Sequence, residues 1–163
     1  MKKLSYDEIK EFNSGIREYI KHSEVQRMKK YIQHGTTSTY EHCVSVAKAS
    51  YKLNRFLHAG SDIKALLKGA MLHDFYLYDW HIKGSCEKLH GYHHADSALE
   101  NARKHFDMTK KEEDIIYSHM WPLNLTRIPR RREAWIVCMA DKYVSIKEIF
   151  DKDRYKSSDN RTE

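Results

Sequence analysis

Apolar residues recur at spacings of three and four along most of the chain, which is the periodicity of amphipathic α-helices. Each predicted helix carries an apolar stripe, and the stripes begin at Ile9, Val25, Val46, Ile63, Ala95, Ile115 and Ala134. Three helices are preceded by Ser or Thr with Glu three residues later, a capping-box pattern that occurs at Ser5, Ser38 and Thr109. The pattern therefore predicts an all-α fold.

The stripes also predict how the chain is organised. Residues 1–35 are expected to form N-terminal helices, including a short second helix that reaches Ile32, packed against a main bundle of residues 36–150. The last helix is predicted to span Arg132–Phe150. Residues 151–163 are polar and aperiodic, so we expect a disordered tail there. The sequence has no internal repeat or Gly/Ser-rich linker, which indicates a single domain.

The composition supports a helical domain that is soluble and cytoplasmic. Only six glycines and two prolines occur in 163 residues, which argues against a many-stranded sandwich or barrel. Apolar residues make up 40% of the chain and charged residues 32%, enough for a core under a solvated surface. Three cysteines without CxxC spacing suit a reducing compartment. No apolar run approaches the roughly 18 residues of a membrane span, so no membrane association is expected.

Several polar residues interrupt the apolar stripes at positions that face the predicted core. They are His42, His73, Asp74, His119 and Asp141. Burying an unpaired imidazole or carboxylate is costly, so each of these groups needs a partner. Any one of them alone is more often a hydrogen-bonded core residue than a ligand, but together they come from four helices of one short chain. Imidazole and carboxylate bind divalent Zn, Mn, Fe, Co, Ni or Mg, so the set predicts a metal site.

These residues resemble the pattern of the HD-domain superfamily of metal-dependent phosphohydrolases. His42 lies in STYEHCVSVA, His73 and Asp74 in GAMLHDFYLYDW, and Asp141 in VCMADKYVS, in the H…HD…D order of that family. The resemblance covers residues from about 36 to 150. It implies a single-domain helical bundle with a central metal site, which hydrolyses a phosphoester or phosphoanhydride bond with metal-activated water.

Members of the superfamily that hold two metal ions carry further histidines between the HD pair and the last Asp. His119 in IIYSHMW and His94 in HADSA are the candidates here, with the adjacent His93 as the alternative to His94. The resemblance then implies two divalent ions per chain, bridged by Asp74, which takes the catalytic role. The implied ligands are His42, His73, Asp74, His94, His119 and Asp141. The set is similar to that of small bacterial hydrolases that split diadenosine tetraphosphate symmetrically.

The substrate is expected to be a small phosphorylated molecule, with a nucleotide as the first choice. Arg127, Arg130 and Arg131 follow the helix of His119 and are candidates for binding the phosphates that do not react, although a solvated helix start explains them equally well. The net charge of +6 suits an anionic substrate. Nucleic acid is not an expected partner, because no basic stripe is interleaved with aromatic residues. Lys142 is interpreted as a surface residue.

A second interpretation is a non-catalytic regulatory module that binds a metal and a nucleotide in the same pocket. The complete set of six candidate ligands favours catalysis over this alternative. His81 and His90, which flank a predicted loop, are minor candidates for ligands. The apolar helical surface can also support a homo-oligomer, although the sequence shows no specific seam for one.

Overall fold

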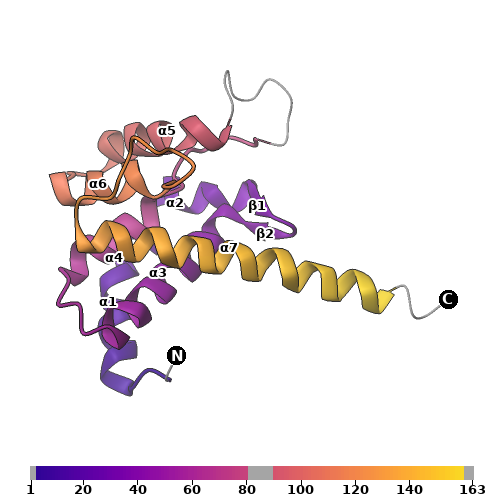
Figure 1. Cartoon of the computed structure of the whole chain (residues 1–163), viewed down its shortest axis with the longest axis horizontal. Coiled ribbons are helices and arrows are strands. Elements are labelled where there is room, and N and C mark those ends of the chain that lie inside the picture. Colours follow the sequence, from indigo (N-terminus) through magenta and orange to yellow (C-terminus); the bar gives the residue numbers. More distant parts are fainter. Residues whose placement is uncertain (1–2, 81–89, 160–163) are drawn as a thin grey trace.

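Helices dominate the computed structural model, which describes residues 3–80 and 90–159 (Figure 1). The α-helices are α1 (Tyr6–Lys21), α2 (Ser23–Arg27), α3 (Thr39–Phe56), α4 (Ile63–Leu72), α5 (His90–His105), α6 (Lys110–Ser118) and α7 (Arg132–Asp159). The other elements are a 3₁₀ helix, η1 (Met28–Lys30), and an antiparallel pair of short strands, β1 (Ile32–His34) and β2 (Thr37–Ser38). The predicted all-α class is confirmed.

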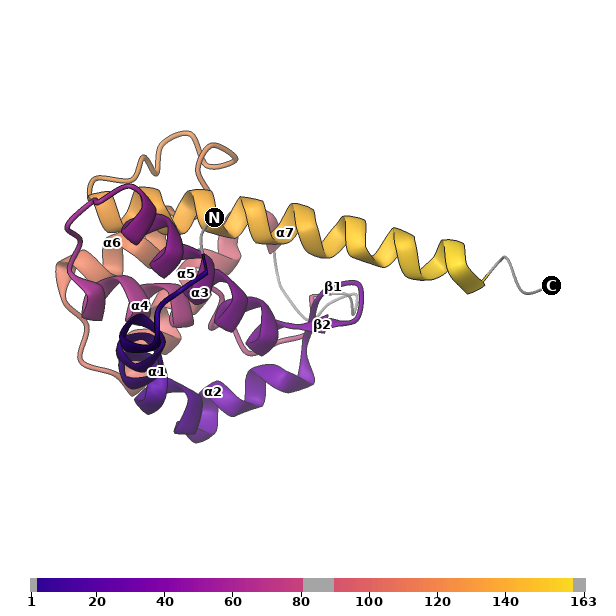
Figure 2. The same ribbon diagram turned by 90° about the horizontal axis from the view of Figure 1, so that it is seen from below.

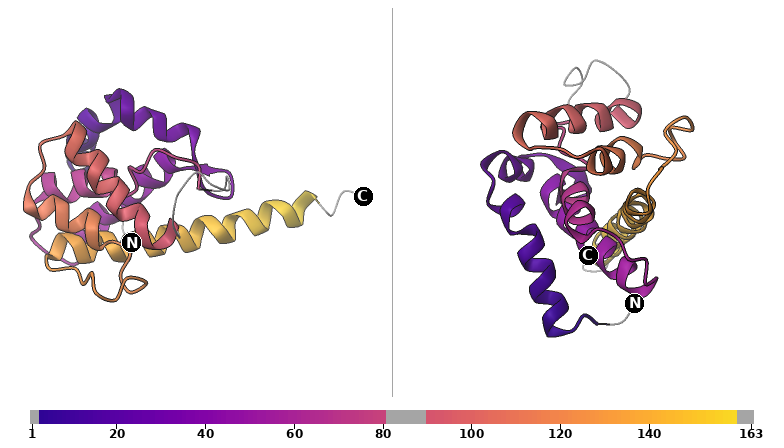
Figure 3. Two further views of the ribbon diagram at one scale, coloured as in Figure 1. Left: turned by 90° about the horizontal axis from the view of Figure 1, so that it is seen from above. Right: turned by 90° about the vertical axis from the view of Figure 1, so that its left-hand side faces the viewer.

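The helices lie in layers around α4. In two views, α5 and α6 lie together on one side of α3, α4 and α7, and α1 lies on the opposite side (Figure 1, Figure 3). Helix α4 contacts α1, α3, α5, α6 and α7. Its buried residues are Ala65, Leu66, Leu67, Gly69, Ala70, Met71 and Leu72. A helix that is apolar on nearly all sides belongs at the centre of a bundle, so α4 carries the residues that follow it into the core.

A close approach of α4 and α6 occurs one turn before each helix ends. A Cβ atom on Gly69 of α4 would lie 2.6 Å from Cγ2 of Ile115 on α6, so only glycine fits at this position. Gly69 precedes His73 by four residues, and Ile115 precedes His119 by four residues. The packing of these two helices therefore brings the two histidines together.

The three predicted capping boxes are confirmed. In each, the Ser or Thr hydroxyl accepts from the backbone N–H three residues on, and the Glu carboxylate accepts from the backbone N–H of the cap. At the start of α3, for example, the N–H of Ser38 donates to Oε2 of Glu41 at 2.9 Å. A cap of this kind contributes about 1 kcal/mol to stability. It also fixes the first turn of α3, directly before His42.

The segment before α3 differs from its prediction. We expected one short helix through Ile32, but the helical chain ends at Lys30 and Ile32 begins strand β1. Between the strands Gly35 has φ +62°, a backbone conformation that glycine adopts readily and that allows a tight turn. The alternation of β1 buries Gln33 and leaves Ile32 and His34 half-buried. The hairpin thus points one polar side chain into the protein.

Helix α7 also differs from its prediction. The periodic pattern ends at Phe150, whereas the helix continues to Asp159 and projects away from the bundle (Figure 1, Figure 2). Residues 151–159 contain no Gly or Pro, so nothing in the backbone interrupts the helix that precedes them. The proposed division of the chain at residues 35 and 36 stays a prediction. Within the described residues, no helix is both long and apolar enough to cross a membrane.

Candidate metal centre

Two buried histidines are held in the same way at the ends of α4 and α6. His73 is the C-cap of α4, and His119 is the C-cap of α6. The Nδ1–H of His73 donates to the carbonyl of Ala70 at 2.8 Å, and the Nδ1–H of His119 donates to the carbonyl of Ile116 at 2.7 Å. These bonds fix the orientation of each ring and turn its Nε2 atom toward the interior. Metal-binding histidines characteristically use one ring nitrogen in this manner.

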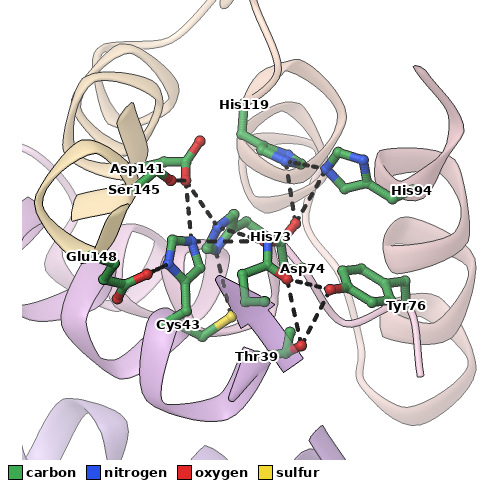
Figure 4. Close-up of polar contacts among 12 residues, drawn as sticks. Thr39, Cys43, His73, Asp74, Tyr76, His94, His119, Asp141, Ser145 and Glu148 are labelled. Atoms are coloured by element: carbon green, nitrogen blue, oxygen red, sulfur yellow. Dashed lines mark hydrogen bonds and ion pairs between the residues drawn. The ribbon is translucent and has the colours of Figure 1, made fainter. Parts of the chain in front are cut away.

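A first group of ligand atoms is formed by His42 of α3, His73 at the end of α4 and Asp141 of α7 around one oxygen of Asp74. Figure 4 shows His73, Asp74 and Asp141 of this group close together. Nε2 of His42 lies 3.2 Å from Oδ1 of Asp141 and 3.8 Å from Oδ2 of Asp74. Nε2 of His73 lies 3.4 Å from Oδ2 of Asp74 and 3.8 Å from Oδ1 of Asp141. All four residues are buried. Two imidazoles and two carboxylates thus converge on one point in the core.

A second group is formed by His94 of α5 and His119 around the other oxygen of Asp74 (Figure 4). The two Nε2 atoms lie 2.9 Å apart, and they lie 3.3 Å and 3.4 Å from Oδ1 of Asp74. Burial lowers the pKa of His119, which favours the neutral ring with its Nε2 lone pair. The Asp74 carboxylate therefore presents Oδ2 to the first group and Oδ1 to the second.

The donor atoms of both groups fit divalent metal ions. Ligand atoms about 2.1 Å from one ion are separated by roughly 3.0–3.4 Å in octahedral or tetrahedral geometry, which matches most of these distances. Within the described part of the chain, Nε2 of His73 and Oδ1 of Asp74 are buried without a hydrogen-bond partner. Burying such atoms unsatisfied is costly, and coordination of an ion would satisfy them.

The charges of the first group also favour binding of a divalent cation. Burial raises the pKa of Asp74, but the charge of His73 and the imidazoles of His119 and His94 beside its Oδ1 hold that pKa well below its usual range. Burial lowers the pKa of His42, but hydrogen bonds to the carboxylates of Asp141 and Glu148 raise it to about 10. In the metal-free protein, protons on the imidazoles balance the carboxylates. A divalent ion supplies the same positive charge.

A comparison with known protein families gives one match. The HD domain family model matches residues 39–146, which include both groups of ligand atoms. The chain belongs to the HD-domain family. Searches of the curated proteins and of the solved structures gave no match.

Membership of this family supports divalent-metal binding and the general class of metal-dependent phosphohydrolases. The structure of this HD domain brings together all six residues that the sequence predicts as ligands. Five of them form two sets of atoms close enough to share an ion, His42, His73 and Asp74 in one and Asp74, His94 and His119 in the other. Asp141 lies beside the first set, with its Oδ1 3.2 Å from Nε2 of His42. His94 is buried, whereas its neighbour His93 is exposed and lies 3.7 Å from Asp96. His81 and the side chain of His90 lie outside the described part of the chain.

Three residues beside the HD site were not predicted from the sequence, and all of them lie outside the matched range. Oε2 of Glu148 accepts from Nδ1 of His42 at 2.9 Å, and Nε2 of Gln33 donates to Oδ2 of Asp74 at 2.7 Å. The ring of His34 is half-buried, with its centre 5.6 Å from that of His42. Glu148 follows Asp141 by two helical turns, so the spacing could have identified it.

A cavity of about 710 Å³ opens onto the HD site. Asp74, His94, His119 and Asp141 line it, together with the apolar side chains of Met120, Pro122 and Leu123. Lys142, interpreted from the sequence as a surface residue, is half-buried at this cavity. Its Nζ donates to the carbonyl of His119 at 2.8 Å and lies 3.8 Å from Oδ2 of Asp141. The cavity thus combines ligand atoms, an ammonium group and apolar surface.

The structure does not bring the predicted phosphate-binding arginines to this cavity. Arg127 pairs with Asp96 at 2.8 Å, and its guanidinium lies 4.3 Å from the centre of the Tyr117 ring. Arg130 and Arg131 line a separate cavity of about 600 Å³. The partner of Arg127 lies 31 positions away in the chain, so local sequence does not reveal it.

Proposed function

We propose that this HD domain is a phosphohydrolase that holds two divalent ions on either side of Asp74 and cleaves a phosphoester or phosphoanhydride bond of a small substrate. The observation that carries the proposal is the arrangement of Asp74, whose two oxygens face two separate groups of imidazole nitrogens. Divalent ions in such a site supply a nucleophilic water at neutral pH and polarise a phosphoryl oxygen.

Each residue of the site has a separate task in this proposal. His42, His73 and Asp141 hold the first ion, and His94 and His119 hold the second. Asp74 would contribute one carboxylate oxygen to each ion. The carbonyls that accept from the Nδ1–H groups of His73 and His119 keep those rings aimed at the ions.

The cavity supports a nucleotide as the substrate. The ammonium group of Lys142 lies beside Asp141, where a phosphate reaching the ions would need a compensating positive charge. Met120, Pro122 and Leu123 offer apolar surface for a base or another planar group. The volume of about 710 Å³ is within the range of pockets that bind small molecules.

The proposal is tested by the metal content and hydrolytic activity of Asp74→Asn, which keeps the shape of the side chain and removes its charge. We expect the wild-type protein to bind two Mn²⁺ or Co²⁺ ions per chain. It should hydrolyse at least one compound from a panel of nucleoside monophosphates, nucleoside triphosphates and diadenosine polyphosphates. Asp74→Asn should lose at least a thousandfold in kcat/KM, or about 4 kcal/mol, because both ions lose a shared anionic ligand. Asp107→Asn makes the same change at an exposed position and should behave as wild type. Two bound ions without hydrolysis of any phosphorylated compound would contradict the proposal.

A further inference from the structure

The side chain of Gln33 makes a buried contact with Asp74 from outside the matched HD domain. Gln33 is the inward residue of strand β1, and its side-chain N–H donates to Oδ2 of Asp74 at 2.7 Å. The contact joins residues 41 positions apart in the chain and is buried. A hydrogen bond from an amide to a carboxylate is stronger than one between neutral groups.

The orientation of the Gln33 amide is itself fixed. The hydroxyl of Tyr76 donates to Oε1 of Gln33, and Oγ1 of Thr39 lies 3.2 Å from the Tyr76 oxygen. A tyrosine hydroxyl carries one proton to donate, and Tyr76 donates it to Gln33. With Oε1 taken as an acceptor by Tyr76, the NH₂ end of the amide must face Asp74.

This contact affects how the two oxygens of Asp74 are divided between the first and second groups of ligand atoms. A carboxylate oxygen has two lone pairs, and Gln33 occupies one of those on Oδ2. The other remains directed at the first group, where Nε2 of His73 lies 3.4 Å away. Holding Oδ2 in place also holds Oδ1, which faces His94 and His119. A single donor therefore sets the position of both oxygens.

We propose that Gln33 is a positioning residue, held by Tyr76, that locks the Asp74 carboxylate in the orientation needed to bind both metal ions. This inference rests on the two-ion site of the proposed function. It assigns a role to the β1–β2 hairpin, which lies before the residues that the HD family model matches. Gln33 contacts the ions only through Asp74, so its effect appears first in metal binding.

The test is a titration of Gln33→Met with Co²⁺, in which the visible absorption of the bound ion reports binding. Methionine has nearly the length of glutamine but cannot donate a hydrogen bond. Loss of a residue that orients a metal ligand typically costs about 10- to 100-fold in affinity. We expect a loss of that size in both binding steps, because Asp74 serves both ions. Gln26→Met is the matched control, since the Gln26 side chain donates to the Ile20 carbonyl away from the site.

A double-mutant cycle separates positioning from general packing. If Tyr76 acts through Gln33, Tyr76→Phe should weaken Co²⁺ binding in the wild-type background and have no further effect in Gln33→Met. Equal effects of Tyr76→Phe in both backgrounds, or a Gln33→Met titration that matches Gln26→Met, would overturn the role of Gln33. A wild-type protein that binds fewer than two Co²⁺ ions would instead overturn the proposed function, and the role of Gln33 with it.

Discussion

The first and second groups of ligand atoms meet at Asp74 but differ in charge and in the helices that carry them. The first group comes from α3, α4 and α7 in the middle layer, and it adds the carboxylate of Asp141 to that of Asp74. The second group comes from α5 and α6 and consists of two imidazoles, with Asp74 as the anion that both groups share.

This difference predicts unequal metal affinities for the two groups. A divalent cation is attracted more strongly to two carboxylates than to one, and Glu148 adds a third negative charge behind His42. Both histidines of the second group, His94 and His119, line the cavity beside Asp74 and Asp141, whereas His42 and His73 of the first group do not. We therefore expect the first group to bind its ion at lower metal concentration. The ion held by the second group should lie nearer the substrate.

The largest effect should come from removing one ligand of each group in turn. His73→Ala should weaken the first Co²⁺ binding step by about a thousandfold, or roughly 4 kcal/mol. The variant loses one ligand of the first ion, and the Asp74 carboxylate loses its neighbouring imidazole. His94→Ala should abolish the second step and leave the first within about threefold of wild type. Isothermal titration calorimetry with Co²⁺ resolves the two steps. Equal losses in both steps for both variants would show that the groups do not bind separate ions.

A smaller effect is expected from Glu148, which supports only the first group. Glu148→Leu should weaken the first step by about 10- to 100-fold and leave the second step unchanged, because the carboxylate orients and polarises His42 alone. Glu100→Leu, at an exposed position on α5, controls for the loss of a negative charge. This pattern contrasts with Gln33→Met, which should weaken both steps. A loss in the second step would contradict the separation of the two groups.

The two steps should also differ in their dependence on pH. His42 in the metal-free protein has a pKa of about 10, so metal binding at lower pH must displace its proton. Affinity for the first Co²⁺ should rise at least tenfold per pH unit between pH 7 and pH 9. The pKa of His119 is lowered, so its ring is already neutral and the second step should change little over the same range. First-step affinities that are equal at pH 7 and pH 9 would contradict this account.

The same titration affects the stability of the metal-free protein. The folded-state pKa of His42 lies above its usual value, so this group stabilises the fold below about pH 6.5. That contribution should be lost as pH rises from about 6.5 through about 10. Thermal unfolding followed by circular dichroism in the presence of a chelator would measure the decline, and saturating Co²⁺ should remove it. A metal-free Tm that rises over this range would be the contrary result.

The smallest effect is expected at His93. Its exposed ring faces Asp96 rather than the ligand atoms, so His93→Ala should leave both Co²⁺ steps within about twofold of wild type. The same substitution at the adjacent His94 should remove the second step, which makes the pair a matched comparison. Loss of the second ion in His93→Ala would show that His93, and not His94, is the ligand.

Features that depend on local sequence could be predicted, and features that depend on tertiary contacts could not. The capping boxes at Ser5, Ser38 and Thr109 were predictable because their hydrogen bonds join residues three apart. The polar residues placed in apolar stripes also indicated the site, because burial of such groups demands a partner. The hairpin was missed because β1 is only three residues long and lacks a clear alternation of apolar and polar residues.

The partners of the arginines were hidden from sequence for the same reason. Arg127 pairs with Asp96, a residue 31 positions earlier, and no local pattern links the two. Gln33 and Asp74 are likewise joined only by the fold. The sequence alone indicates a surface lysine at position 142, yet the carbonyl of His119 at the end of α6 lies within reach of its long side chain.

The most direct test of the central claim is a crystal structure of the protein with bound Mn²⁺, with anomalous scattering used to locate the ions. The account predicts two peaks, one beside Oδ2 of Asp74 among His42, His73 and Asp141, and one beside Oδ1 between His94 and His119. A single peak, or two peaks of which one does not contact Asp74, would contradict it.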